Sequence, residues 1–132
     1  MNGSPILKDK DKKVKTKKIR ITKADEKFSK YIRTRDGWIC QRCGRRYTPP
    51  TNGLQCSHFW GRANKCTRFD PENCDALCYG CHSLWEGNKQ GDYRDFKIRQ
   101  LGKKGYEALE KRARSTCKES EEIIKCMIFL NL

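Results

Sequence analysis

Apolar residues near the start of the ordered pattern recur at helical intervals, at Phe28, Tyr31 and Ile32. This i, i+3, i+4 spacing places the three side chains on one face of a helix. Thr22 is a residue type that caps helix starts, and Gly37 is one that ends helices. The pattern predicts an amphipathic helix over residues 23–35 with a buried apolar face.

The apolar spacing changes after a loop that contains Pro49, Pro50 and Gly53. Short apolar runs bounded by turn residues predict one strand over residues 54–59 and a second over 74–77. Helical spacing then returns and predicts a helix over about 79–87. Two strands followed by a helix form a small ββα unit, in which the end of the first strand faces the start of the helix.

The last third of the chain is predicted to be helical, over residues 92–101, 106–113 and 120–130. Gly102 closes the first of these helices. The last one is apolar over more than one face, so it should be buried, either against the first helix of the chain or in a partner subunit. A homodimer through the C-terminal helices is the second of these two expectations.

Cysteines give a strong chemical signal. Two Cys-x-x-Cys pairs, Cys40 with Cys43 and Cys78 with Cys81, lie on either side of the first predicted strand. Four thiolates at this spacing predict a structural zinc site, because Zn²⁺ tolerates soft sulfur ligands and prefers tetrahedral coordination. Most of the other five cysteines are interpreted as small buried hydrophobic residues: Cys56, Cys66, Cys74, Cys117 and Cys126.

The charge of the chain indicates a class of partner. Its 132 residues, the length of one domain, include 30 Lys and Arg against 16 Asp and Glu, a net charge of +14. Such a surplus favours a polyanion, and nucleic acid fits better than a membrane because no long apolar segment is evident. No secretory signal is evident either, so we expect a cytoplasmic protein. In that reducing compartment disulfides explain the cysteines poorly.

Residues 1–21 form a basic segment with few apolar residues. It cannot bury enough surface to offset the entropy of ordering, so we expect a flexible tail ahead of one folded domain over 22–132. The tail is either an arm that contacts nucleic-acid phosphates or a solubilising terminus. The arm interpretation assigns phosphate contacts to Lys13, Lys15, Lys17 and Lys18.

Two histidines and an asparagine mark the ββα unit. Asn73 lies 15 residues after His58 and 9 before His82, which directly follows Cys81. This order and spacing resemble the HNH endonucleases, whose core is the ββα-metal or His-Me finger fold. The string from Cys56 to Arg94 is also similar to the phage recombination proteins of the NinG/Rap type. The resemblance covers about 38–96 and implies DNA as the partner, in a bacterial or phage-infected host cell.

The resemblance implies a role for each of the three residues. His58 matches the general base, which draws a proton from the attacking water. Asn73 matches the middle residue, which in some members ligates the metal and in others braces the loop that aims the base. His82 matches the final histidine, a ligand of the catalytic Mg²⁺ or Mn²⁺. Independently of the family, a neutral imidazole suits a base near physiological pH.

Two further residues are candidate ligands of the catalytic metal. Ser57 stands just before His58, where many HNH enzymes have an acid or a histidine, and its hydroxyl is a poor ligand. Glu86 follows His82 by four residues, so the imidazole and the carboxylate share one helix face. Glu86 either replaces the missing ligand or is a solvated helix residue.

The loop after His58 is basic, through Arg62, Lys65 and Arg68. Their cationic groups could clamp phosphates on either side of a cut bond, or the loop could simply be exposed. We interpret the aromatic residues around the unit as core rather than as platforms for stacked bases: Trp60, Tyr79 and Trp85.

These observations predict an α+β fold, a small zinc-stapled ββα-metal core over 38–96 with flanking helices that include C-terminal helices over 97–132. The predicted function is that of an HNH endonuclease, which nicks or cleaves DNA by hydrolysing phosphodiester bonds with Mg²⁺ or Mn²⁺. The alternative is a non-catalytic zinc-knuckle module that binds nucleic acid or assists recombination. A translation or RNA-processing factor would explain the charge and the zinc, but not the spacing of His58, Asn73 and His82.

Overall fold

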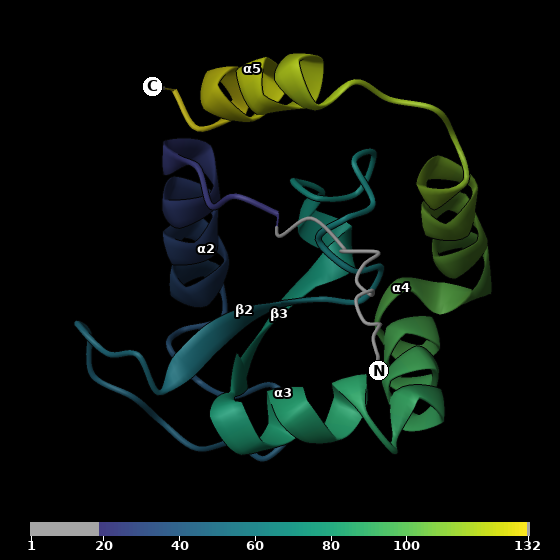
Figure 1. Cartoon of the computed structure of the whole chain (residues 1–132). Helices are drawn as coiled ribbons and strands as arrows, with labels where there is room; N and C mark the ends of the chain where they lie inside the picture. Colours follow the sequence, from purple (N-terminus) through teal and green to yellow (C-terminus); the bar gives the residue numbers. More distant parts are fainter. Residues whose placement is uncertain (1–18, 132) are drawn as a thin grey trace, which may run out of the picture.

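The computed structural model describes residues 19–131, so the tail lysines predicted to contact phosphates lie outside the described residues. In chain order the elements are α2 (Lys23–Arg35), β2 (Leu54–His58), the 3-10 helix η1 (Pro71–Asn73), β3 (Cys74–Cys78), α3 (Tyr79–Glu86), α4 (Gln90–Ala113) and α5 (Glu119–Phe129). The β2–β3 hairpin lies in the middle and the four helices surround it (Figure 1). The predicted mixture of helices and a small sheet is confirmed.

Helix α2 has the predicted bounds because its first turn is capped. The backbone N–H of Asp25 donates to Thr22 Oγ1 at 3.2 Å, and the Asp25 carboxylate accepts from the Thr22 N–H at 2.7 Å. This reciprocal pair satisfies two backbone donors that have no partner within the helix. Phe28 and Ile32 are buried on the face that packs toward the hairpin.

The hairpin places the predicted site residues by its register. His58 pairs with Cys74 and Ser57 pairs with Asp75 in the antiparallel ladder. Directly opposed residues share a face of the sheet and successive residues alternate, so His58, Cys56 and Cys74 lie on one face and Ser57 and Asp75 on the other. Helix α3 follows β3 without a loop. The predicted order of two strands and a helix is confirmed.

Two apolar clusters flank the hairpin. The first contains Leu77, Trp85 and Tyr93 and lies beside the two Cys-x-x-Cys pairs. The second joins α2, the hairpin and α5. Trp85 is core, as predicted. Tyr79 is not, because 70% of this residue is exposed at the start of α3.

Helix α4 is bent where a helix end was predicted. Gly102 has φ 77° and ψ 163°, a left-handed φ that favours glycine. The first half of α4 is tied to the hairpin by a buried ion pair, in which Lys97 Nζ lies 2.8 Å from an Asp75 carboxylate oxygen. Tyr93 and Gln100 donate further hydrogen bonds to the same carboxylate, so this charge is fully partnered.

Helix α5 packs on α2, as expected if its apolar surface is buried against the first helix of the chain. The Tyr31 and Phe129 rings meet edge to face with centroids 5.3 Å apart, and Cys126 is buried between the helices. Ile128 remains 71% exposed, and a homodimer stays a prediction. Among residues 19–131, no helix combines the length and the apolar character needed to cross a membrane.

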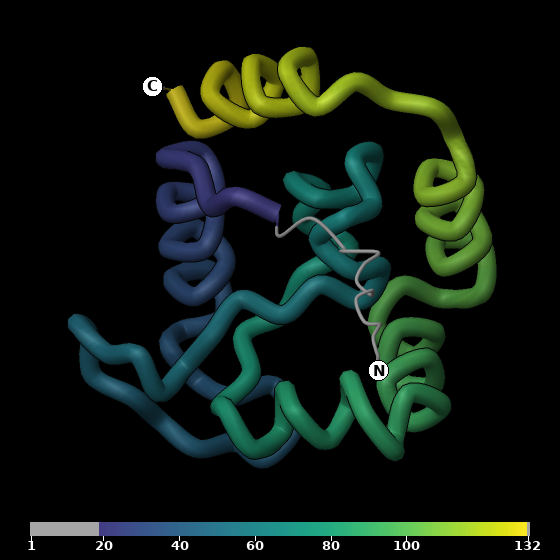
Figure 2. The backbone as a smooth tube through the Cα atoms, in the orientation of Figure 1, coloured from purple at the N-terminus to yellow at the C-terminus, as the bar shows by residue number. Residues whose placement is uncertain are grey.

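Two cysteines interpreted as buried hydrophobic residues form a disulfide instead. Cys66 lies in the loop between β2 and η1, Cys117 lies in the connection between α4 and α5, and their sulfurs are bonded. The loop folds up toward that connection (Figure 2). The prediction failed because the two cysteines are 51 residues apart and only the tertiary fold brings them together.

Candidate metal centre and histidine pocket

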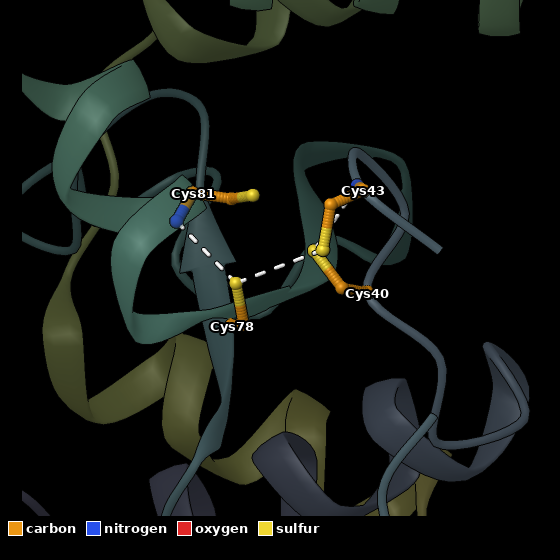
Figure 3. Close-up of side chains that lie close together, drawn as sticks. All are labelled: Cys40, Cys43, Cys78 and Cys81. Carbon is orange, nitrogen blue, oxygen red and sulfur yellow. Dashed lines mark hydrogen bonds between the residues drawn. The ribbon is translucent and has the colours of Figure 1, made fainter. Parts of the chain in front are cut away.

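The four cysteines of the two Cys-x-x-Cys pairs converge at the end of the hairpin (Figure 3). We call Cys40, Cys43, Cys78 and Cys81 the knuckle cluster. Cys40 and Cys43 come from the turn after α2, whereas Cys78 and Cys81 come from the end of β3 and the first turn of α3. Their sulfurs all lie within 4.8 Å of one another, and those of Cys43 and Cys78 are 3.9 Å apart. A cluster of four cysteine sulfurs could hold a metal such as zinc, as the spacing predicted.

The surroundings of the cluster shift the pKa values of its thiols in opposite directions. Burial disfavours the Cys40 thiolate, but backbone N–H groups, including that of Cys43 at 3.5 Å, outweigh it and lower the pKa of Cys40 to about 7. Burial and neighbouring thiols raise the pKa of Cys81 to about 12, although Arg42 lies 3.5 Å from its sulfur. Without a cation the four cysteines are therefore not all thiolates. The positive charge of a bound dication would stabilise the deprotonated form of all four.

Both histidines line one cavity of about 600 Å³, which we call the histidine pocket. His58 reaches it from the last residue of β2 and His82 from the first half of α3. Arg62 and Glu86 also line its wall. The structure thus brings together residues predicted as base, metal ligand, phosphate contact and second ligand.

His58 is held in one tautomer. Its Nε2 lies 2.9 Å from the backbone carbonyl oxygen of Arg68. A carbonyl only accepts, so Nε2 carries the proton and the neutral ring keeps its lone pair on Nδ1. Burial lowers the pKa of His58 to about 4, and the positive charge of Arg62 adds to that effect. The imidazole is therefore neutral near physiological pH.

His82 contacts Glu86 one helical turn away, as the spacing predicted. Its Nδ1 lies 2.6 Å from Gln55 Oε1, and its Nε2 lies 2.9 Å from a carboxylate oxygen of Glu86. Because the amide oxygen accepts, Nδ1 holds the proton and the lone pair on Nε2 of a neutral ring faces the carboxylate. Because the Nε2 lone pair and the carboxylate oxygen repel each other at 2.9 Å, this contact needs a proton or a metal cation between the two atoms.

Asn73 is buried and braces the loop that follows His58. Its Oδ1 accepts from the Trp60 N–H at 2.8 Å, and its Nδ2 donates to the carbonyls of Trp60 and Thr67 at 2.9 and 3.0 Å. Both ends of the amide are therefore engaged by backbone. Of its two predicted roles, the geometry supports bracing, whereas Asn73 as a metal ligand is not supported.

Ser57 does not reach the histidine pocket. It lies on the opposite face of β2 from His58, fully buried, and its Oγ lies 3.1 Å from the oxygen of the Tyr93 hydroxyl, which donates its proton to Asp75. The alternation of side chains along a strand makes this placement unavoidable. The assignment of Ser57 as a metal ligand is therefore not supported.

Arg68 was predicted to clamp phosphate, but the structure buries it. Its guanidinium forms two hydrogen bonds to Asp25, at 2.6 and 2.9 Å, and one to Glu119 at 2.6 Å. This loop arginine can be buried because two carboxylates, at the starts of α2 and α5, neutralise the charge of its guanidinium. Arg62 lines the histidine pocket and Lys65 is exposed, so these two stay candidates for phosphate contact.

Two residues beside the pocket were missed. Cys56 and Cys74 were interpreted as packing residues, yet their sulfurs and a ring nitrogen of His58 lie within 4.8 Å of one another. The signal was present in the sequence, because Cys56 and His58 alternate along a predicted strand and Cys74 begins the strand predicted to pair with it.

Comparison with known families extends the resemblance beyond the ββα unit. The profile of the NinG family, described as bacteriophage lambda NinG protein, matches residues 5–128. The match includes much of the basic segment and most of the C-terminal helices, which the motifs alone did not reach. Neither the curated proteins nor the solved structures gave a match. The chain belongs to the NinG family.

Proposed function

We propose that the histidine pocket is the catalytic site of a metal-dependent HNH-type endonuclease that nicks or cleaves DNA. The observation that carries the proposal is that His58, from the first strand of a ββα unit, and His82, from its helix, line one cavity of a unit that also holds a four-cysteine cluster. Phosphodiester hydrolysis requires a base for water, charge stabilisation on phosphate and assistance to the leaving oxygen.

His58 serves as the general base. Its proton sits on Nε2, bonded to Arg68, so Nδ1 is the atom that accepts the proton of the attacking water. The depressed pKa keeps this acceptor unprotonated near physiological pH. It also makes the imidazole a weaker base than free histidine, so the reaction depends on other groups to acidify the water.

His82 and Glu86 would hold the catalytic Mg²⁺ or Mn²⁺. Their facing electron-rich atoms, 2.9 Å apart, fit this assignment because a cation removes the repulsion between them. When bound, the ion neutralises charge on the scissile phosphate and on the leaving oxygen. Arg62 also lines the pocket, and its positive charge would attract a phosphate while its terminal nitrogens donate to the carbonyls of Ile19 and Arg20.

DNA is the proposed substrate, supported by the net charge of +14 and by the membership of the chain in a phage protein family. The competing proposal is a non-catalytic module in which the same histidines only support the fold. It shares the cysteine cluster and the charge, so only an activity measurement separates the two.

The test is nicking of supercoiled plasmid by wild type, His58→Ala and His82→Ala across a Mn²⁺ titration. Loss of the base should lower nicking by about 100-fold or more at every Mn²⁺ concentration. Loss of a ligand should be partly rescued by high Mn²⁺, because it weakens metal affinity. Circular dichroism and retention of the zinc at the four-cysteine cluster control for folding. Full activity in folded His58→Ala would favour the non-catalytic module.

A further inference from the structure

Three ligand atoms that prefer soft metals meet on the face of the hairpin that packs toward α2. The sulfurs of Cys56 and Cys74 and a ring nitrogen of His58 lie within 4.8 Å of one another. The register explains the cluster, because His58 is directly opposite Cys74 and Cys56 is the next residue of β2 on that face. The four sulfurs of the knuckle cluster likewise lie within 4.8 Å of one another.

We propose that Cys56, His58 and Cys74 form a second metal site, for a thiophilic dication such as Zn²⁺, and that binding there withdraws the base from catalysis. The binding site stands on the geometry alone. Its inhibitory effect rests on the proposed function of His58.

The chemistry of binding balances without another reactant. Zn²⁺ displaces one proton from each of the two thiols, and the imidazole contributes the lone pair on Nδ1 while Nε2 stays bonded to Arg68. The product, a dication with two thiolates and a neutral ring, has no net charge. Cys74 is fully buried, and a neutral centre can be accommodated there where a lone thiolate cannot.

The site is open on one side. Cys56 and His58 both line the histidine pocket, so a water molecule or a solute can take the fourth tetrahedral position. It is also distinct from the knuckle cluster, which uses Cys40, Cys43, Cys78 and Cys81 and shares no residue with it.

The two ligand sets select different ions. Sulfur ligands favour Zn²⁺ over Mg²⁺ and Mn²⁺, which prefer oxygen. Glu86 and His82 offer an oxygen and a nitrogen in the same pocket. Zinc should therefore inhibit by occupying the three-residue site and holding Nδ1 of His58, rather than only by replacing Mn²⁺ near Glu86.

The first experiment counts metal. Zinc-loaded protein is dialysed against Zn²⁺ and analysed for zinc per chain, and Co²⁺ is added in parallel to detect thiolate-to-metal absorption. Wild type should bind one zinc more than Cys56→Ala and Cys74→Ser. Cys126→Ala is the matched control, because Cys126 is a buried thiol in the same apolar cluster as Cys74 but is not one of the three proposed ligands. Equal zinc in wild type and folded Cys56→Ala overturns the site.

The second experiment measures inhibition of Mn²⁺-dependent nicking by added Zn²⁺. Cys56→Ala should raise the inhibitory zinc concentration by about tenfold or more, since it removes one of three ligands. Cys126→Ala should behave like wild type. Unchanged inhibition in Cys56→Ala overturns the inhibitory role. If no variant nicks DNA, the proposed nuclease function fails, and the zinc count still decides the site.

Discussion

The backbone carbonyl of Arg68 accepts a hydrogen bond from Nε2 of His58 at 2.9 Å. The side chain of the same arginine is bonded to Asp25 at the start of α2 and to Glu119 at the start of α5. The orientation of the proposed base is thus tied to two helices through one residue that never enters the pocket. A residue predicted to touch DNA acts instead as the anchor of the imidazole.

The tautomer and charge of His58 can be measured directly. The chain has two histidines, so the spectrum of each is assigned by mutating the other. Nitrogen chemical shifts should report a proton on Nε2 of His58, and its titration should fall near pH 4, because burial lowers the pKa to about 4. A His58 titration near the unperturbed value of about 6.5 would contradict the buried, neutral ring.

The same shift predicts how stability depends on pH. The folded pKa of His58 lies below the unfolded value, so its contribution is complete above about pH 6.5 and declines as the pH falls toward 4. Between pH 8 and pH 5 the free energy of unfolding should decrease by about 2 kcal/mol through this residue. Denaturant unfolding of wild type and His58→Asn checks this, since the variant should lack that part of the decrease.

Asn73 is expected to support the loop without binding metal. Asn73→Ala removes three hydrogen bonds to the backbone of Trp60 and Thr67, and should lower the free energy of unfolding by about 1–3 kcal/mol. Nicking should fall while the Mn²⁺ concentration for half-maximal activity stays constant. Asn73→Asp, which keeps only the acceptor, is the companion variant. A higher Mn²⁺ requirement in either would instead indicate a ligand.

Removing metal from the knuckle cluster should unfold the domain, because this part of the core is small and joins segments far apart in the chain. The exposed Cys43 offers the mildest test. Cys43→Ser should lose tightly bound zinc and the near-ultraviolet circular dichroism of Trp85, which packs in the adjacent apolar cluster. Wild-type protein that contains no zinc yet is folded and active would contradict the assignment.

The basic tail is expected to act through phosphate neutralisation. Deleting residues 2–18 should weaken DNA binding at low salt and flatten the dependence of affinity on salt, with little effect on nicking at saturating DNA. The deletion stops at 18 because the carbonyls of Ile19 and Arg20 accept hydrogen bonds from Arg62 and Arg68. An unchanged salt dependence would leave the tail as a solubilising terminus.

Features set by local patterns could be predicted from the sequence. The capping pair of Thr22 and Asp25 defines the start of α2, and the two Cys-x-x-Cys spacings predicted the cysteine cluster. His58 and His82 could be assigned to one site because their order along a ββα unit determines their approach.

Features that depend on contacts between residues far apart in the sequence could not be predicted. Arg68 resembles an exposed loop cation until Asp25 and Glu119, 43 and 51 residues away, converge on it. The Cys66–Cys117 bond depends on the same convergence of the loop and the α4–α5 connection. Local periodicity contains no information about such partners, and the assignment of these residues failed for that reason.

The Cys66–Cys117 bond also makes the molecule a closed covalent ring with two open arms. Residues 66–117 form the ring, which holds His82 and two of the knuckle cysteines, whereas His58 and the other two lie on the N-terminal arm. A protease cut inside the ring leaves one molecule on a non-reducing gel. A cut in the N-terminal arm leaves a fragment attached by the hairpin, the cysteine cluster and the contacts of Arg68, whereas a cut in the C-terminal arm leaves α5 attached by its packing on α2 and by the bond between Glu119 and Arg68.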